Sequence, residues 1–270
     1  LIDEIKEIKN NLKNKINRKT TFDVAPEIEI PDFDQYIEEE PITIILSSQN
    51  WIRSQKGYVD LNSEFKFREG DTIKKVIHAK TNDKIIFFSD NGSFYSILGN
   101  KLPSGRGFGE PLSKFFDLDN NEKIVNSFTF FEGEVAIAST DGLGFKISTN
   151  KLIAYTRSGK KVFNLNDNEK AKALTKCDNE YLAVTGSNRK LLIFNLSELP
   201  ELNKGKGVIL QRYRDGYLED IKSISKSEGL NWKLSGGRQR TEKDIMYWIG
   251  KRGGVGKLVP NGFPRPPKFD

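Results

Sequence analysis

The 270-residue sequence has very little of the residues that build metal centres and nucleophilic sites. It holds one cysteine, Cys177, and one histidine, His78. A single cysteine excludes an intramolecular disulfide framework and a cysteine zinc site, and it is typical of a reducing compartment. Together the two residues leave too little material for a Cys–His nucleophile. We therefore expect a cytoplasmic protein with no metal site, in which His78 is an ordinary strand residue.

Long apolar runs are also absent. The longest, Ile42–Leu46 and Ile85–Phe88, fall far short of the about 18 residues that a membrane-spanning helix needs. No membrane partner is expected. The sequence starts at Leu1 and its one methionine is Met246, which indicates that it is a piece of a longer chain.

Basic charge is concentrated in the larger part of the chain. Lys and Arg total 43 and Asp and Glu 37, which gives a net charge of +6 and a pI of about 9.1. Residues 1–40 hold 6 basic and 11 acidic side chains, so residues 41–270 hold 37 basic and 26 acidic ones. Such an excess attracts polyanions and can pair with phosphates if the cations converge. The alternative is a lysine-rich solvated surface without a binding role.

The first 40 residues divide into two segments. Apolar residues recur at helical spacing and predict an amphipathic helix over residues 1–18: Leu1, Ile5, Ile8, Leu12 and Ile16. Residues 19–40 are acidic and contain Pro26 and Pro31. They predict an extended linker that could compete with DNA for the basic part of the chain.

From residue 41 onward, pairs of apolar strands joined by a tight turn recur. The expected turn residues are Asn50, Gly92, Gly142, Asn188 and Gly237, at spacings of 42, 50, 46 and 49. Gly adopts positive φ freely and Asn tolerates it, as such turns require. A strand repeat of this length predicts an all-β, propeller-like fold of about five four-stranded blades over residues 41–258. Residues 259–270 then form a Pro-rich tail.

After each hairpin comes a loop that mixes glycine with cations. On a radial array such loops lie along one rim, where they form a positive band that DNA could follow through its phosphates. The alternative is that they are ordinary turns between blades. The predicted DNA-binding residues, which we call the rim cations, are Arg53, Lys56, Arg106, Arg157, Lys160, Lys161, Lys204, Lys206, Lys251, Arg252 and Lys257.

Two glycine-rich segments match nucleotide-binding motifs poorly. Gly250–Leu258 has one residue too many before its Gly-Lys pair, and Leu258 stands where a phosphate loop needs Ser or Thr. Gly105, Gly107 and Gly109 lack the third-glycine spacing of a dinucleotide site. No catalytic residue and no cofactor are therefore assigned to this chain.

Several joined segments resemble a known family. They are EPITIILSSQNWIRSQKG, LPSGRGFGEPL, DGLGFKI and LSELPELNKGKGVILQRYRDGYLEDI, with Arg18-Lys19-Thr20 after the first helix. In this order they are similar to the C-terminal domain of the A subunit of bacterial DNA topoisomerase IV (ParC), in the GyrA/ParC family of type IIA topoisomerases.

The resemblance implies a β-pinwheel, a propeller-like fold whose blades exchange strands. It implies that the strand-cleaving tyrosine lies upstream, outside this chain, and that Mg²⁺ and ATP bind elsewhere in an A2B2 enzyme that includes the B subunit of topoisomerase IV. The gyrase A subunit carries a Q-R-R-G-G-K-G box for tight DNA wrapping. This sequence lacks it, and Leu202–Val208 keeps only the G-K-G part, so we expect weaker bending.

The sequence thus predicts a domain that binds and bends double-stranded DNA and presents it to the upstream catalytic core in the bacterial nucleoid, for decatenation and supercoil relaxation. The alternative is a protein-binding propeller without a DNA role. A propeller enzyme is disfavoured, because the acids, histidines and metal ligands that such enzymes gather are scarce. The chain by itself is expected to be non-catalytic.

Overall fold

The computed structural model describes residues 1–13, 38–61, 63–105, 107–234 and 237–269. The chain divides into two units, residues 1–35 and residues 36–270. In the first, α1 (Ile2–Leu12) buries no side chain, and Ile5 and Ile8 are more than half exposed. An amphipathic helix is thus present where the 3.6-residue spacing predicts one. Of the expected linker, only residues 38–40 lie in the described part.

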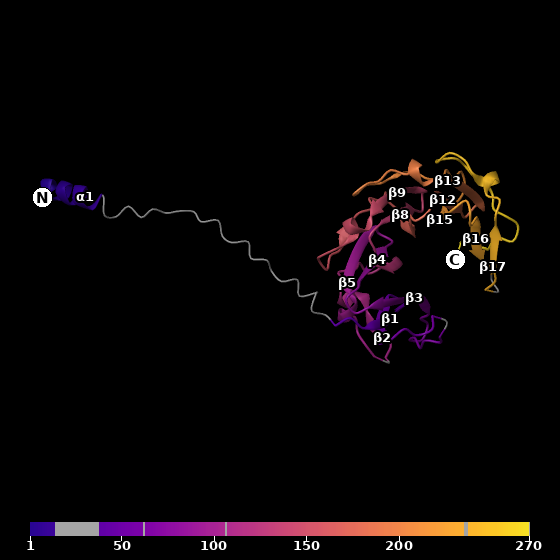
Figure 1. Cartoon of the computed structure of the whole chain (residues 1–270), viewed down its shortest axis with the longest axis horizontal. Coiled ribbons are helices and arrows are strands. Elements are labelled where there is room, and N and C mark those ends of the chain that lie inside the picture. The colour runs from indigo at the N-terminus through magenta and orange to yellow at the C-terminus, as the bar shows by residue number, and fades with distance from the viewer. Residues whose placement is uncertain (14–37, 62, 106, 235–236, 270) are drawn as a thin grey trace. The chain divides into compact units, whose positions relative to one another are not determined.

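The second unit consists of antiparallel strands and short 3-10 turns (Figure 1). The strands are β1 (Pro41–Ser47), β2 (Trp51–Lys56), β3 (Ile73–Lys80), β4 (Lys84–Ser89), β5 (Ser93–Leu98), β6 (Glu110–Pro111), β7 (Ile124–Thr129), β8 (Glu134–Ser139), β9 (Leu143–Ser148), β10 (Lys160–Lys161), β11 (Ala171–Lys176), β12 (Tyr181–Gly186), β13 (Lys190–Asn195), β14 (Val208–Ile209), β15 (Leu218–Ile224), β16 (Leu230–Lys233), β17 (Gln239–Glu242) and β18 (Lys257–Leu258). The 3-10 turns are η2 (Gly99–Lys101), η3 (Leu112–Lys114), η4 (Thr149–Leu152), η5 (Leu196–Glu198) and η6 (Met246–Trp248).

The strands form four four-stranded sheets and one hairpin. The sheet orders are β3-β1-β2-β6, β10-β5-β4-β7, β11-β8-β9-β14 and β15-β12-β13-β18, which we call blades 1 to 4. The fifth repeat contributes the pair β16–β17. The all-β, propeller-like prediction is confirmed. In the described residues the fifth repeat differs from the other four, because it has two strands instead of four.

The hairpin turns follow the predicted glycines and asparagines with one shift. Asn50, Gly92 and Gly142 have φ values of 61°, 85° and 81°. In the fourth hairpin the positive φ of 61° belongs to Arg189, one residue after the expected Asn188. Asn188 instead accepts a hydrogen bond from the Lys190 amide through its side chain, which stabilises the turn.

Each blade takes its outermost strand from the following repeat. β6 comes after the blade 2 hairpin but pairs with β2 of blade 1, and β10 comes after the blade 3 hairpin but pairs with β5 of blade 2. β14 and β18 repeat this arrangement on blades 3 and 4. This exchange is the β-pinwheel arrangement that the family resemblance implies.

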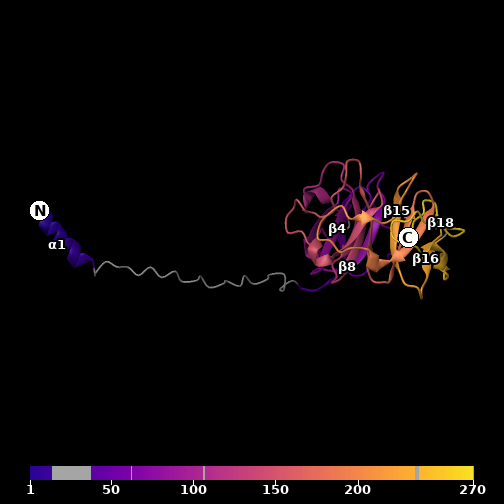
Figure 2. The same ribbon diagram turned by 90° about the horizontal axis from the view of Figure 1, so that it is seen from above.

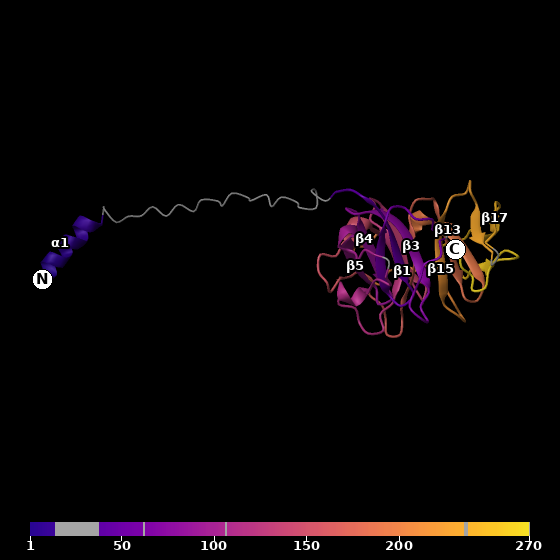
Figure 3. The ribbon, with the colours of Figure 1, turned by 90° about the horizontal axis from the view of Figure 1, so that it is seen from below.

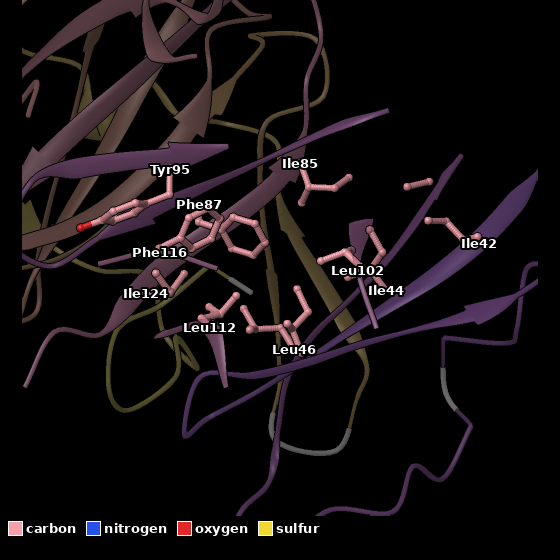
Figure 4. Packing of buried hydrophobic residues seen from close by; sticks show 12 residues of the cluster. Ile42, Ile44, Leu46, Ile85, Phe87, Tyr95, Leu102, Leu112, Phe116 and Ile124 are labelled. Carbon is pink, nitrogen blue, oxygen red and sulfur yellow. The ribbon is translucent and has the colours of Figure 1, made fainter. Parts of the chain in front are cut away.

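The hydrophobic core lies between consecutive blades. In β4, Ile85 and Phe87 pack toward blade 1, whereas Ile86 and Phe88 pack toward blade 3. Figure 4 shows the first of these clusters, which contains Ile44 of blade 1 and Phe87 of blade 2. Successive side chains on a strand point to opposite faces, so a strand buried on both faces is a continuous apolar run.

The Pro-rich tail belongs to this core. Phe263 and Phe269 are buried with Trp232 of β16. The Phe269 carbonyl accepts a hydrogen bond from the Lys233 amide at 3.2 Å, and the Thr185 hydroxyl donates to the Pro267 carbonyl at 2.7 Å. The C-terminal end accordingly lies among β15, β16 and β18 (Figure 2). The tail covers the fifth hairpin, which has no exchanged strand among the described residues.

Candidate nucleic-acid interface

The glycine-cation loops lie at the outer edge of the blades. The loops after the second to fifth hairpins lead into an exchanged strand, β6, β10, β14 or β18, which is the last strand on one side of its sheet, whereas the segment with Arg53 and Lys56 overlaps β2. The opposite, inner edges are formed by β3, β7, β11 and β15, which contact one another in that order. The periodicity in the sequence therefore places these loops at equivalent positions on successive blades.

One glycine before each exchanged strand allows the backbone to approach the neighbouring blade closely. Gly109, Gly159, Gly207 and Gly256 have φ values between 70° and 84°. A Cβ at Gly256 would lie 2.6 Å from the Leu191 carbonyl oxygen, and the other three positions are similarly crowded. These residues are glycine because the backbone turns left-handed against a neighbouring strand.

The loop amides are largely occupied within the protein. Gly250, Gly253 and Gly254 donate their amides to the carbonyls of Ile193, Leu210 and Lys251. These three amides are therefore not free to bind a phosphate, and in this loop the side chains are the groups that can do so.

Blade 2 presents exposed cations on its exchanged strand. Lys160 and Lys161 of β10 are both exposed, and Lys161 Nζ donates to the Asn91 carbonyl. Arg157, in the loop before them, pairs with Asp117 at 3.4 Å. Because this ion pair is more than half exposed, it is weak and leaves the guanidinium accessible.

Blade 3 carries Lys204 and Lys206 in the loop before β14. Both are exposed, and Lys206 Nζ donates to Asn166 Oδ1 at 2.6 Å. Lys204 makes no side-chain hydrogen bond or ion pair within the part of the chain that the structure describes. Its charge is therefore uncompensated by any described neighbour.

Blade 4 has a basic groove of about 800 Å³ between β14 and residues 249–257. Its floor includes Leu192 and Trp248, and no acidic residue is among its described lining residues. The cations that line it are Arg212, Lys251, Arg252 and Lys257.

These four cations differ in how they are held. The Arg252 guanidinium donates to the carbonyls of Glu198 and Ile209, and Lys257 Nζ lies 4.1 Å from the centre of the Tyr247 ring. Lys251 and Arg212 are exposed. Sequence reasoning missed Arg212, which comes three residues after β14.

Blade 1 departs from the predicted pattern. Arg53 is only 4% exposed, and its guanidinium donates to the carbonyls of Lys66 and Gly107. Desolvation lowers its pKa. Arg53 therefore holds two loops together and is not a free cation at the edge, which corrects that part of the prediction.

The two other rim cations of the first repeats are Lys56 and Arg106. Lys56 pairs with Glu40 at 2.5 Å, and this contact raises its pKa, but its side chain is 77% exposed and stays accessible. Arg106 lies outside the described residues. Among the described rim cations, Lys56 of blade 1 and those of blades 2, 3 and 4 are therefore accessible.

Comparison with known proteins agrees with this architecture. A profile of the family described as DNA gyrase C-terminal domain, beta-propeller, matches residues 83–130, 133–178 and 180–227. The chain belongs to this family. The resemblance predicted from the sequence is thereby confirmed.

Individual relatives of this gyrase C-terminal domain family are similar over nearly the whole chain. The A subunit of DNA topoisomerase 4 from Caulobacter vibrioides is 42% identical over 94% of this chain, and the one from Rickettsia bellii is 38% identical over 93%. The chain spans 34% of the length of each. The solved C-terminal domain of Escherichia coli ParC has a TM-score of 0.70 and 28% identity, covering 82% of this chain and 95% of the other.

A second segment of the chain is similar in sequence to the gyrase wrapping box. If the last box glycine is placed at the glycine before an exchanged strand, Gly250–Gly256 matches at Arg252, Gly253, Gly254 and Gly256. This is a better match than Leu202–Val208, although the glutamine and the lysine of the box are absent from it. The best remnant of the box therefore lines the blade 4 groove.

The described residues contain no group of His, Cys, Asp and Glu side chains that could hold a metal ion. No helix in the described ranges is long and apolar enough to cross a bilayer.

Proposed function

We propose that this chain is the DNA-binding and DNA-bending domain of a topoisomerase IV A subunit. It holds a duplex segment by its phosphates and presents it to an upstream breakage-reunion core, for decatenation and supercoil relaxation in the bacterial cytoplasm. Strand cleavage with Mg²⁺, ATP hydrolysis and assembly with the B subunit belong to parts of the enzyme outside this chain. The chain itself cleaves no DNA.

One observation carries the proposal. Exposed cations recur at the same outer edge on three successive blades: Lys160 on blade 2, Lys204 on blade 3 and Lys251 on blade 4. A duplex that follows this edge neutralises phosphates at regular intervals, which releases counterions and favours binding.

Bending follows from the same arrangement. The blades follow one another around the inner strands (Figure 1), so a duplex in contact with several of them has to curve. Phosphate contacts along the curved path offset the free energy that bending the DNA costs. Because the full wrapping box is absent, moderate bending is proposed and not a tight chiral wrap.

Alanine substitution of Lys204 and Lys206 tests the proposal. Phosphate contacts carry no sequence information, so binding should weaken about equally on unrelated duplexes, and the slope of log K against log salt should fall by about one unit per lost contact. Fluorescence anisotropy with labelled duplexes measures both quantities.

Alanine substitution of Lys9 and Lys13, the last cations of the helical segment, is the control and should leave affinity unchanged. If that pair abolishes binding while Lys204 and Lys206 prove dispensable, the edge is not the DNA site. If no duplex binds at all, the chain is a protein-binding propeller instead.

A further inference from the structure

The four inner strands begin at one end of the propeller axis. Ile73, Ile124, Ala171 and Leu218 stand at equivalent positions near the start of β3, β7, β11 and β15. Each is opposite the last residue of the central strand of its sheet. Side chains next to these positions therefore converge around the axis, on the opposite side of each sheet from the exchanged strands.

Lysines gather at this end of the axis. We call Lys74, Lys123, Lys170, Lys172 and Lys268 the axial lysine cluster. They come from blades 1, 2 and 3 and from the C-terminal tail. Lys75, beside Lys74, donates to Asn126 Oδ1 at 2.6 Å.

Acidic residues compensate only part of this charge. Asp90 pairs with Lys170 at 2.8 Å, and Glu219 is shared between Lys172 at 3.3 Å and Lys268 at 3.9 Å. Asp220 accepts hydrogen bonds from the backbone amides of Ile221 and Phe269. In the described ion pairs, three lysines of the cluster thus share two carboxylates: Lys170, Lys172 and Lys268.

The side chains of Lys74 and Lys123 have no acidic partner among the described contacts, although the Lys123 backbone amide donates to Asp90 Oδ1 at 2.9 Å. Lys74 Nζ donates to the Ile124 carbonyl, and neither side chain makes an ion pair within the described ranges. Desolvation lowers the Lys74 pKa most, and the charge of Lys123 lowers it next. Asp90 raises this pKa, and the charge of Lys268 has the smallest of the four effects and lowers it. Contacts bring these groups together: Lys74 reaches the carbonyl of Ile124, the residue after Lys123, and Asp90 joins the Lys123 amide to Lys170. Glu219 in turn joins Lys172 to Lys268 of the tail.

We propose that the axial lysine cluster is a second anion site, which takes a compact phosphate-bearing polyanion. A multivalent phosphate placed between Lys74, Lys123 and Lys268 would relieve their mutual repulsion and accept charge-assisted hydrogen bonds from three ammonium groups. Because the groups come from different blades and from the tail, the bound anion would tie the first and last parts of the propeller together. The site does not depend on DNA binding at the outer edge.

Thermal unfolding of the whole chain with sodium tripolyphosphate tests this inference. At ten times its dissociation constant the ligand should raise Tm by about 3–5 °C. Sodium sulfate at equal ionic strength controls for general salt stabilisation. A Tm rise no larger than that of sulfate would overturn the site.

Two double variants show where tripolyphosphate binds. The axial pair is Lys74→Gln with Lys123→Gln, and the edge pair is Lys160→Gln with Lys161→Gln. The axial pair should lose the tripolyphosphate shift and keep its affinity for duplex DNA, whereas the edge pair should keep the shift and lose DNA affinity. If the axial pair keeps the shift, or if it loses DNA affinity as the edge pair does, there is no separate axial site.

Stability without ligand gives a second measurement. Lys123→Gln alone removes like-charge repulsion and should raise the Tm of the ligand-free chain slightly. A single Lys268→Gln variant, in the tail, serves if the double variant fails to fold, and it should weaken tripolyphosphate binding at least threefold in isothermal titration calorimetry. Unchanged affinity in Lys268→Gln contradicts the proposal.

Discussion

The free edge of the hairpin is covered differently in the first four repeats and in the fifth. Blades 1 to 4 each receive a two-residue strand from the following repeat, whereas the β16–β17 hairpin receives the aromatic tail, with Phe269 only 1% exposed. Figure 3 shows the two ends of the series, with β1 and β3 in the first blade and β17 in the last hairpin. The fifth repeat supplies its glycine-cation loop and β18 to blade 4, so its own β16–β17 hairpin receives no such loop among the described residues.

The exchanged strands and the buried tail therefore contribute to the protein in different ways. Exchange links each blade to its neighbour and brings cations to the surface, whereas the tail closes the series by burial. Changes in the tail should therefore alter stability more than DNA binding, and changes in the exchange loops should alter both.

Truncation of the tail aromatic should have the largest effect. Phe269→Ala removes a buried ring beside Phe263, and we expect a loss of about 3–4 kcal/mol in the free energy of unfolding. Urea unfolding followed by tryptophan fluorescence measures it, since Trp232 packs in the same cluster. Tyr155→Ala, at an 87% exposed aromatic, is the control. Equal losses for the two variants would contradict closure by the tail.

An added methyl group at an exchange glycine should have the next largest effect. Gly256→Ala places Cβ at 2.6 Å from backbone and side-chain atoms, whereas Gly237→Ala, at φ 76° instead of 77°, meets nothing within 4 Å. In both variants the left-handed backbone should lower the free energy of unfolding by about 1–2 kcal/mol. In Gly256→Ala the steric overlap should lower it by about 1–3 kcal/mol more. Urea midpoints compare them. Should Gly237→Ala be as damaging as Gly256→Ala, close strand approach would not explain the glycine.

A hydroxyl group added in blade 3 should raise the stability of the chain slightly. In blade 2, the Tyr95 hydroxyl donates to Glu122 Oε1 at 2.9 Å, whereas in blade 3 Phe145 occupies the equivalent position and Glu169 Oε1 is buried without a partner. Phe145→Tyr should therefore raise the free energy of unfolding by about 0.5–1 kcal/mol.

The opposite face of a sheet offers the control for this gain. Phe94→Tyr, at a ring stacked on Phe88, should lower stability. Thermal unfolding compares the two variants with the parent chain, and a loss in Phe145→Tyr would show that the two blades are not equivalent there.

Local features of the fold were predictable from the sequence. The turns at Asn50, Gly92 and Gly142 require positive φ, which few residues tolerate, so their residue types mark them. The exchange was not predictable from periodicity, because a two-residue strand carries no pattern of its own. It followed from the family resemblance instead.

The candidate site was predictable in its placement more than in its individual members. Spacing brought Lys160, Lys204 and Lys251 to one edge, but it could not reveal that Arg53 lies on a strand covered on both faces. The contacts of the Pro-rich tail were not predicted, because its prolines dominate its composition. The two large aromatic residues of the tail, Phe263 and Phe269, are the feature of the sequence that indicates its burial.

The most direct test of the account is the salt dependence of duplex binding for the parent chain and for the Lys160→Ala, Lys161→Ala double variant. The slope of log K against log salt should be steep for the parent, at about −0.9 per phosphate contact, and shallower by about two units for the variant. Equal slopes for the two proteins, or a parent affinity that does not change with salt, would contradict DNA binding through the cations of the outer edge.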